Sequence, residues 1–315
     1  MREKQKSFLS VVVYVHNNEK TIGSFLKMLY HVFSANFEHY EIICVDDASA
    51  DGSAERIREA AGVMKDMTLS ILHMSYFQGI EPAMAAGVDL AIGDYVYEFD
   101  GPEQDYPEEF IMEVYEKALS GYDAVSAVPK RRQRFSSALF YRLYRCGTAG
   151  RYEMRTERFR VLSRRLLNRV GGMHRRVPYR KAVYAASGLP MERMEYACTG
   201  EESRHRDHQE KEYRQELAVT SLILFTDLGY KFSIRMTFLM MGIAMLMGIY
   251  AAMVYLYGSP IEGWTTTVLF MAFAFFGLFG ILTIIVKYLS VLVELIFKRQ
   301  PYVTEGVEKI TIGNC

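Results

Sequence analysis

Three polar clusters in the first third of the chain carry residue types that suit the binding of a nucleoside diphosphate. The clusters are residues 17–19 (NNE), residues 46–49 (DDAS) and residues 100–105 (DGPEQD). Carboxylates such as Asp46 and Asp47 can accept hydrogen bonds from ribose hydroxyls or base N–H groups. Asp100, followed by further oxygen-bearing side chains, suits Mg²⁺ or Mn²⁺ bound to a diphosphate. The clusters therefore predict a nucleotide site that uses a divalent cation.

Each cluster also has a purely structural interpretation. Asp51 and Ser53, just beyond the second cluster, suit the capping of a helix that begins near Ser53. The third cluster, with Pro102 and Pro107, has the composition of an acidic turn. For the paired aspartates of the second cluster we favour ligand binding over capping.

Apolar runs and helical spacing place the clusters on the elements of an α/β domain. Strands are predicted at residues 8–15, 41–45, 69–73, 95–99 and 124–128. Helices are predicted at residues 20–33, 53–63 and 82–91. Asn17 or Asn18 would cap the first of these helices. The alternation indicates a parallel sheet with helices on both faces, and the three clusters should converge where its strands end.

A basic block follows the predicted sheet. Residues 130–181 hold 17 Lys or Arg against only two Glu, although the formal net charge of the chain is zero. Such a block attracts anionic headgroups, phosphate esters or nucleic acid. Within it, residues 161–170 have the pattern of a helix with three arginines on its surface.

Two long runs, residues 236–257 and 265–286, contain no charged side chain. As a helix, each run of 22 residues would measure about 33 Å, enough to cross a hydrocarbon core of about 30 Å. We therefore predict a transmembrane hairpin rather than two buried helices of a soluble core. This hairpin makes headgroups and phosphate esters, not nucleic acid, the expected partners of the basic block.

The residues around these runs predict how the chain meets the bilayer. Residues 217–234 have the apolar spacing of an interfacial helix. Lys231 and Arg235 precede the first run and three basic residues follow the second, whereas the intervening turn carries only Glu262. The positive-inside rule therefore places the soluble part and both termini in the cytosol. Glycines in the runs would permit close helix packing and a homo-oligomer.

Several segments together resemble a known family. Residues 11–19 (VVVYVHNNE), 45–53 (VDDASADGS) and 93–100 (GDYVYEFD) resemble, in order and spacing, the nucleotide-sugar half of a family 2 inverting glycosyltransferase. Residues 158–165 (RFRVLSRR) resemble the acceptor-side arginine motif of that family. Residues 231–235 (KFSIR) and 298–302 (KRQPY) are similar to the bactoprenol-phosphate glucosyltransferase branch. Dolichol-phosphate mannose synthases are more distantly similar.

The resemblance implies a fold and a domain organisation. The fold would be GT-A, a Rossmann-like α/β domain with a mainly parallel sheet and helices on both faces, followed by the two-helix hairpin. The implied parts are a cytosolic glycosyltransferase domain, an interfacial segment, the transmembrane hairpin and a cytosolic tail. They would occupy residues 1–215, 216–234, 235–298 and 299–315 respectively.

The resemblance also implies a reaction at the cell membrane. A sugar would pass from a UDP- or GDP-sugar to polyprenyl (undecaprenyl) phosphate on the cytosolic face. The lipid phosphate is already anionic, so positioning and charge neutralisation would do most of the catalysis.

The implied site residues divide by ligand. The donor would be bound by Asn17, Glu19, Asp46 and Asp47. Mg²⁺ or Mn²⁺ would be held by Asp100 and Gln104. The acceptor phosphate would be held by Arg131 and Arg160, with Arg132 and Arg164 as alternates.

The chain departs from the family pattern at three positions. Pro102 stands where the family usually has a second acid, and its side chain cannot ligate a metal. Tyr14 and His16 replace a usual proline and a usual aromatic residue. Three alternatives follow: a rebuilt metal site using Glu103 or Asp105, a different mode of holding the nucleotide, or a catalytically silent relative that acts as a membrane scaffold.

Overall fold

A computed structural model describes residues 4–64, 67–130, 157–172, 179–199 and 302–311, together with scattered residues between 213 and 292. The chain divides into two compact units. The first comprises Met1–Tyr141, Tyr152–Leu217 and Gln300–Cys315, and the second comprises Arg142–Arg151 and Ala218–Arg299.

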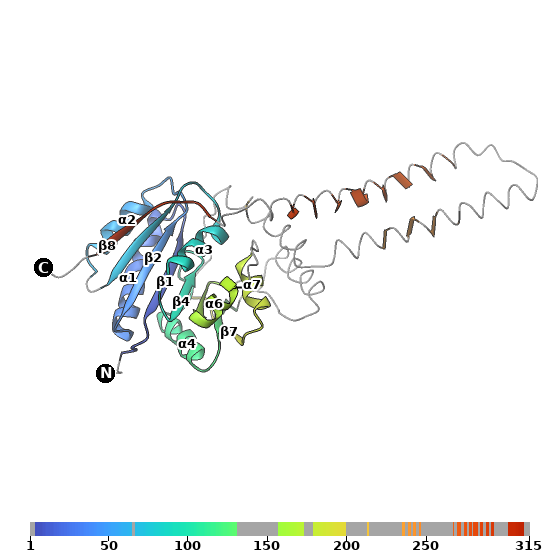
Figure 1. Ribbon diagram of the computed structural model, residues 1–315. Helices are drawn as coiled ribbons and strands as arrows, with labels where there is room; N and C mark the ends of the chain where they lie inside the picture. The colour runs from blue at the N-terminus through green and yellow to red at the C-terminus, as the bar shows by residue number, and fades with distance from the viewer. Residues whose placement is uncertain are drawn as a thin grey trace, which may run out of the picture. The chain divides into compact units, whose positions relative to one another are not determined.

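The described strands of the first unit form one eight-stranded sheet (Figure 1). They are β1 (Leu9–Val15), β2 (Tyr40–Asp46), β3 (Thr68–Met74), β4 (Tyr95–Phe99), β5 (Ala124–Pro129), β6 (Phe159–Ser163), β7 (Met191–Tyr196) and β8 (Thr304–Thr311). Their order across the sheet is β7-β5-β6-β4-β1-β2-β3-β8. All seven residues of β1 are buried, because this strand is covered on both faces.

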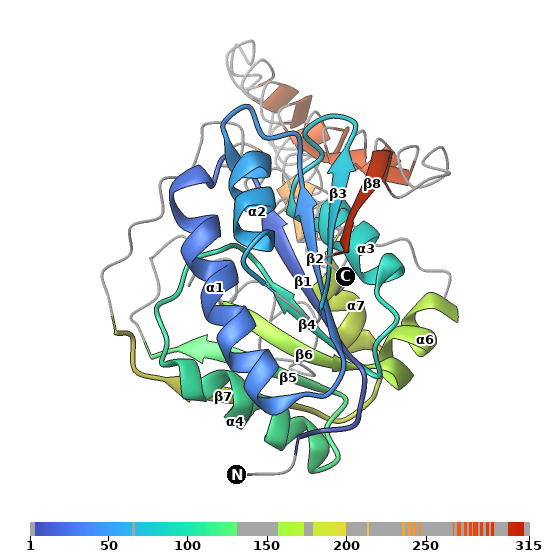
Figure 2. The ribbon, with the colours of Figure 1, turned by 90° about the vertical axis from the view of Figure 1, so that its left-hand side faces the viewer.

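Helices cover both faces of the sheet. One face carries α1 (Glu19–Asn36), α2 (Ser53–Ala61) and α4 (Glu108–Leu119), and Figure 2 shows α1 and α2 side by side. The other carries α3 (Ile80–Leu90), α6 (Arg164–Gly172) and α7 (Arg180–Ala186). Successive strand residues alternate between the faces, so Val11 and Val13 pack towards α1 while Val12 packs towards α3.

Helix α3 packs closely on the centre of the sheet. A Cβ atom added at Gly87 would lie 2.4 Å from Val12 Cγ1 and 2.6 Å from Val45 Cγ2. The absence of a side chain at Gly87 therefore lets α3 approach β1 and β2. The start of α3, at Ile80, borders the candidate site.

The α/β fold with helices on both faces is confirmed, and the five predicted strands occur within two residues of their expected limits. The sheet is mixed: four of its strand pairs are parallel, and β6 and β8 pair antiparallel with their neighbours. The helix predicted over residues 161–170 is wrong at its start. Residues 161–163 complete β6, where Phe159–Ser163 is buried up to its last residue, and α6 begins only at Arg164.

The second unit is described only at scattered residues. A Cβ atom added at Gly277 would lie 2.4 Å from Met240 Cε, so the two apolar runs are in contact there. None of the helical segments that the described residues make up is long and apolar enough to cross a membrane. Most of the two predicted spans and of the interfacial helix lies outside the described residues, and the hairpin stays a prediction.

Candidate functional site

The loops that follow β1 and β2 interlock at the ends of these strands. His16 Nδ1 lies 2.8 Å from the carbonyl oxygen of Asp47, and the Asn17 amide donates to Ser49 Oγ at 3.1 Å. Asn17 and Ala48 both have left-handed backbone conformations, with φ of 54° and 52°. Such conformations are costly for residues other than glycine and persist where surrounding contacts hold them. The two loops are thus held together in a defined shape.

Asp47 ties these loops to the start of α3. Its buried carboxylate accepts hydrogen bonds from Tyr14 Oη at 3.0 Å and from the amides of Gln78 and Gly79, each at 2.8 Å. Burial raises the pKa of Asp47, and these hydrogen bonds oppose the rise by stabilising the carboxylate. Asp47 therefore positions the loop between β3 and α3. Its predicted contact with a nucleotide stays a prediction.

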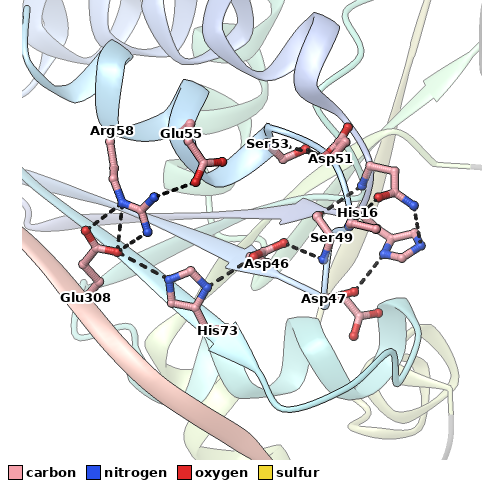
Figure 3. A network of polar contacts seen from close by, with 12 residues as sticks. His16, Asp46, Asp47, Ser49, Asp51, Ser53, Glu55, Arg58, His73 and Glu308 are labelled. Carbon is pink, nitrogen blue, oxygen red and sulfur yellow. Dashed lines mark hydrogen bonds and ion pairs between the residues drawn. The ribbon is translucent and has the colours of Figure 1, made fainter.

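Asp46 points to a different set of partners (Figure 3). Its carboxylate accepts the Ser49 amide at 3.1 Å and lies 3.2 Å from His73 Nδ1. Glu19, the other predicted donor-binding carboxylate, accepts the Gly52 amide at 3.3 Å. Both acids lie at the carboxyl edge of the sheet, in or beside the interlocked loops.

Asp51 has a structural role in the same loops. It accepts the amide of Glu19, the first residue of α1, and the amide of Ser53, the first residue of α2, each at 3.0 Å. These contacts agree with the capping interpretation of Asp51. Asn18 occupies the cap position of α1 but makes no capping bond, because its side chain accepts the His16 amide instead.

A second group of charged side chains is buried between β4, β6, α3 and α7. We call it the ionic cluster; its members are Glu81, Glu98, Asp100, Glu157, Arg160, Arg180 and Lys181. Register places Glu98 on β4 directly opposite Arg160 on β6. Arg160 Nη1 donates to Glu98 Oε2 at 2.8 Å, and Arg160 Nη2 lies 3.1 Å from Asp100 Oδ2.

Helix α7 supplies the other cations of the cluster. Arg180 contacts Glu81 at 2.9 Å, Glu98 at 2.9 Å and Asp100 at 3.4 Å. Lys181 Nζ lies 3.8 Å from Asp100 Oδ2. Four carboxylates against three cations leave the cluster with one net negative charge when all its groups are ionised.

The arginines of this cluster remain charged although they are buried. Burial lowers the pKa of Arg160, but the carboxylates of Asp100, Glu98 and Glu157 outweigh that effect and raise the pKa above its ordinary value. The same balance holds for Arg180, whose pKa is raised by its carboxylate neighbours against the effect of burial. A buried charge with several partners is costly to leave unpaired, so the cluster fixes the position of Asp100.

The interlocked loops and the ionic cluster meet at the start of α3. Asp47 binds the amides of Gln78 and Gly79, and two residues later Glu81 accepts the Arg180 amide at 2.8 Å. Arg180 in turn contacts Asp100. The convergence that the sequence predicted at the ends of the strands is therefore confirmed.

The third polar cluster offers few free metal ligands. Asp105 binds Arg158 at 2.9 Å and accepts Tyr196 Oη at 2.6 Å, and Glu103 lies 3.5 Å from Arg158. Pro102 is buried. Among the described residues, no three His, Cys, Asp or Glu side chains form a group that could hold a metal by themselves.

A metal that brings phosphate ligands with it fits better than a free ion. Mg²⁺ in such sites is commonly held by one or two carboxylates and by substrate phosphates. Asp100 is the most exposed carboxylate of an ionic cluster that has a net negative charge. Gln104 uses its amide nitrogen for the carbonyl of Tyr106, so its amide oxygen is the atom that could ligate a metal.

The predicted acceptor-side arginines have different environments. Arg131 and Arg132 lie outside the described residues. Arg160 is fully buried in the ionic cluster. Arg164 donates to the carbonyl oxygens of Ala91 at 2.8 Å and Gly93 at 2.6 Å, which anchors α6 to the sheet.

Sequence reasoning missed several residues of the site. Glu98, Arg180, Lys181, Tyr184, His73 and Glu308 were not singled out. One signal was available: strand residues 95–99 (YVYEF) place a glutamate in an otherwise apolar run that is buried on both faces, and such a glutamate needs a buried cation.

A largely parallel α/β sheet with acidic clusters at the carboxyl ends of its strands is typical of nucleotide-binding enzymes. Residues 10–185 match Glycosyl transferase family 2, and the chain belongs to this family. The uncharacterized glycosyltransferase YkcC of Bacillus subtilis is 31% identical over 193 residues, 59% of each protein. The undecaprenyl-phosphate 4-deoxy-4-formamido-L-arabinose transferase of Aeromonas hydrophila is 35% identical over 133 residues, 42% of this chain and 40% of that protein.

The matches to these relatives span less than two thirds of their length. Among solved structures, the mannosyltransferase PcManGT of Pyrobaculum calidifontis, in complex with GDP-Man and Mn²⁺, superposes with a TM-score of 0.52. The superposition covers 94% of this chain and 89% of that one at 16% identity, and it supports the fold alone.

Proposed function

We propose that the protein transfers a sugar from a nucleoside diphosphate sugar to polyprenyl phosphate at the cytosolic face of the cell membrane. The observation that carries the proposal is the junction at the start of α3, where Asp47 binds Gly79 and Arg180 joins Glu81 to Asp100. The interlocked loops after β1 and β2, which we call the donor loops, and the ionic cluster thereby border one region. The family membership supports a sugar as the transferred group.

The donor is proposed to lie along the interlocked loops. Asp46, Glu19 and Asn17 offer oxygen acceptors to base and ribose, as the resemblance implies. Asp100 is proposed to lie beside the diphosphate. A negative diphosphate next to a cluster with one excess negative charge requires additional cations, because like charges in a poorly solvated site repel strongly.

A divalent cation is the first of these additional charges. We propose that Asp100 and Gln104 hold Mg²⁺ or Mn²⁺ when the diphosphate is present. The ion would neutralise the charge that develops on the leaving nucleotide. The protein's own part is to hold Asp100 in place through Arg160, Arg180 and Lys181.

The acceptor is proposed to be a lipid phosphate. Relatives named undecaprenyl-phosphate transferases support this class, as do the basic block and the predicted hairpin. The phosphate oxygen is already a nucleophile at neutral pH. Arg131, with Arg132 as the alternate, is proposed to hold it by paired hydrogen bonds.

The test incubates membranes that contain the full-length protein with radiolabelled UDP- and GDP-sugars and polyprenyl phosphate. We expect one label to enter the lipid phase in the wild type. Asp100→Asn should abolish this incorporation, whereas Glu109→Gln, an exposed carboxylate on α4, should leave it unchanged. Wild-type membranes that incorporate no label from any donor, although the protein binds nucleotide, would instead support a catalytically silent relative.

A further inference from the structure

The segment that follows the second apolar run returns to the sheet. Residues 302–311, which we call the C-terminal segment, include β8, and β8 pairs antiparallel with β3 from Thr68↔Thr311 to Met74↔Thr304. The sequence suggested only a tail here. Three of the eight residues of β8 are charged, which agrees with an edge strand.

A chain of polar contacts runs from this segment to Asp46 (Figure 3). Glu308 binds the guanidinium of Arg58 through two oxygens, with Nε–Oε1 at 3.0 Å and Nη2–Oε2 at 2.9 Å. The same carboxylate lies 3.5 Å from His73 Nε2, and His73 Nδ1 lies 3.2 Å from Asp46. His73 therefore stands between the carboxylates of Glu308 and Asp46, one on each ring nitrogen.

A second chain of contacts runs from the same segment to Asp47. The side chain of Gln78 makes two hydrogen bonds with the backbone of Val303, at 2.6 Å and 2.9 Å. The backbone N–H of Gln78 donates to Asp47 at 2.8 Å. The paired aspartates at the end of β2 are thus each connected to the C-terminal segment through one intermediate residue, Asp46 through the side chain of His73 and Asp47 through Gln78.

Two residues of the segment, Tyr302 and Ile310, are partly buried against the core, whereas Val303 and Val307 are exposed. Backbone pairing and polar contacts add to this attachment. Among the polar contacts, those of Glu308 with His73 and of Val303 with Gln78 lie beside the interlocked loops, as expected of an element that orients the site.

We propose that the C-terminal segment is part of the donor site, in which Glu308 acts through His73 on Asp46, and Val303 acts through Gln78 on Asp47. The ligand class is a nucleoside diphosphate sugar, so the inference rests on the proposed function. His73, Gln78 and Glu308 are positioning residues. They hold the carboxylates of Asp46 and Asp47 in the arrangement that binds the nucleoside.

The test compares Glu308→Gln with Glu305→Gln in the full-length protein in detergent micelles. Glu305 is an exposed carboxylate of the same strand, and it makes no ion pair with the part of the chain that the structure describes. We expect Glu308→Gln to raise the Kd for UDP or GDP, and the KM for the donor, about five- to tenfold. The KM for polyprenyl phosphate and kcat should change less than about twofold in both variants.

A double-variant cycle separates positioning from general destabilisation. If Glu308 acts through His73, His73→Gln should weaken nucleotide binding to a similar extent, and the double variant should be no weaker than either single one. Additive losses would overturn the relay. Should Glu308→Gln fail to fold, Gln78→Ala tests the second connection by the same nucleotide Kd.

The outcomes distinguish this inference from the proposed function. A wild type that binds a nucleotide, with Glu308→Gln and Glu305→Gln binding it equally well, overturns the inference and leaves the function standing. A wild type that binds neither UDP nor GDP, with or without Mn²⁺, overturns the proposed function and the inference with it.

Discussion

Arg160 offers a test of how the ionic cluster is stabilised. Its guanidinium is buried and contacts Glu98 at 2.8 Å, Asp100 at 3.1 Å and Glu157 at 3.2 Å. Arg160→Met keeps a long side chain but removes the charge. Glu98 would keep Arg180 and Tyr184 as partners. Among the residues that the structure describes, Glu157 would keep the 3.7 Å contact with Lys181 as its ion pair.

The magnitude follows from these contacts. The net charge of the cluster would change from one to two negative charges, with Glu98 and Glu157 still buried. Breaking a buried ion pair by removing one partner costs about 3–5 kcal/mol. For a domain of this size, each kcal/mol lowers Tm by about 2–4 °C, so we expect Tm to fall by about 6–20 °C.

The assay is thermal unfolding of the purified full-length protein, followed by intrinsic fluorescence or a thermal-shift dye. Arg56→Met is the matched control, because Arg56 and its partner Glu59 are largely exposed. Exposed pairs contribute little to stability, and this control should unfold close to the wild type. A Tm for Arg160→Met within about 2 °C of the control would refute the reasoning. Loss of transfer in Arg160→Met should be interpreted only below its own unfolding transition.

The remaining predictions concern the site and its supports. Asp100→Asn should abolish lipid incorporation, a loss of at least about 100-fold in rate, because it removes the carboxylate proposed to hold the divalent cation beside the diphosphate. Mn²⁺ alone should leave Tm unchanged, whereas Mn²⁺ with UDP or GDP should raise it; a rise with Mn²⁺ alone would show a metal site that needs no phosphate. Arg58 holds the pKa of Glu308 below its ordinary value of 4.5, so Glu308 should stabilise the fold above that pH and lose its effect as the pH falls through the lowered pKa. The difference in Tm between wild type and Glu308→Gln, measured from about pH 7 to pH 3, should therefore shrink in acid, and a difference that grows in acid would contradict this sign. Gly87→Ala should destabilise by about 1–3 kcal/mol in thermal unfolding, because the added Cβ meets two core valines, and an unchanged Tm would show that α3 can move.

Local patterns in the sequence were sufficient to predict the elements that carry the site. The apolar runs of β1 and β2 are buried on both faces, and that property can be recognised from a few consecutive residues. The placement of Asp46, Asp47 and Asp100 at strand ends follows from the same runs. The convergence of these residues needs only the rule that parallel strands end at one edge.

The sequence did not reveal the partners of the charged residues. Arg160 was expected to face a lipid phosphate, yet it pairs in register with Glu98, 62 residues away along the chain. Whether an arginine in a basic block faces solvent or the core depends on strand order and register. Neither can be read from the charges of its neighbours in the sequence.

The sequence by itself determined the α/β class, the polar loops after β1 and β2, and the family. Each of these depends on short segments that can be recognised without knowing which residues they contact elsewhere in the fold. Only the tertiary structure decided that α7 places Arg180 and Lys181 beside Asp100, and that a strand near the end of the chain reaches the interlocked loops. Glu308 and Arg58 are 250 residues apart and meet because β8 joins the free edge of β3. A contact of that kind depends on backbone hydrogen bonds, which any residue but proline can make, so side-chain patterns carry little trace of it.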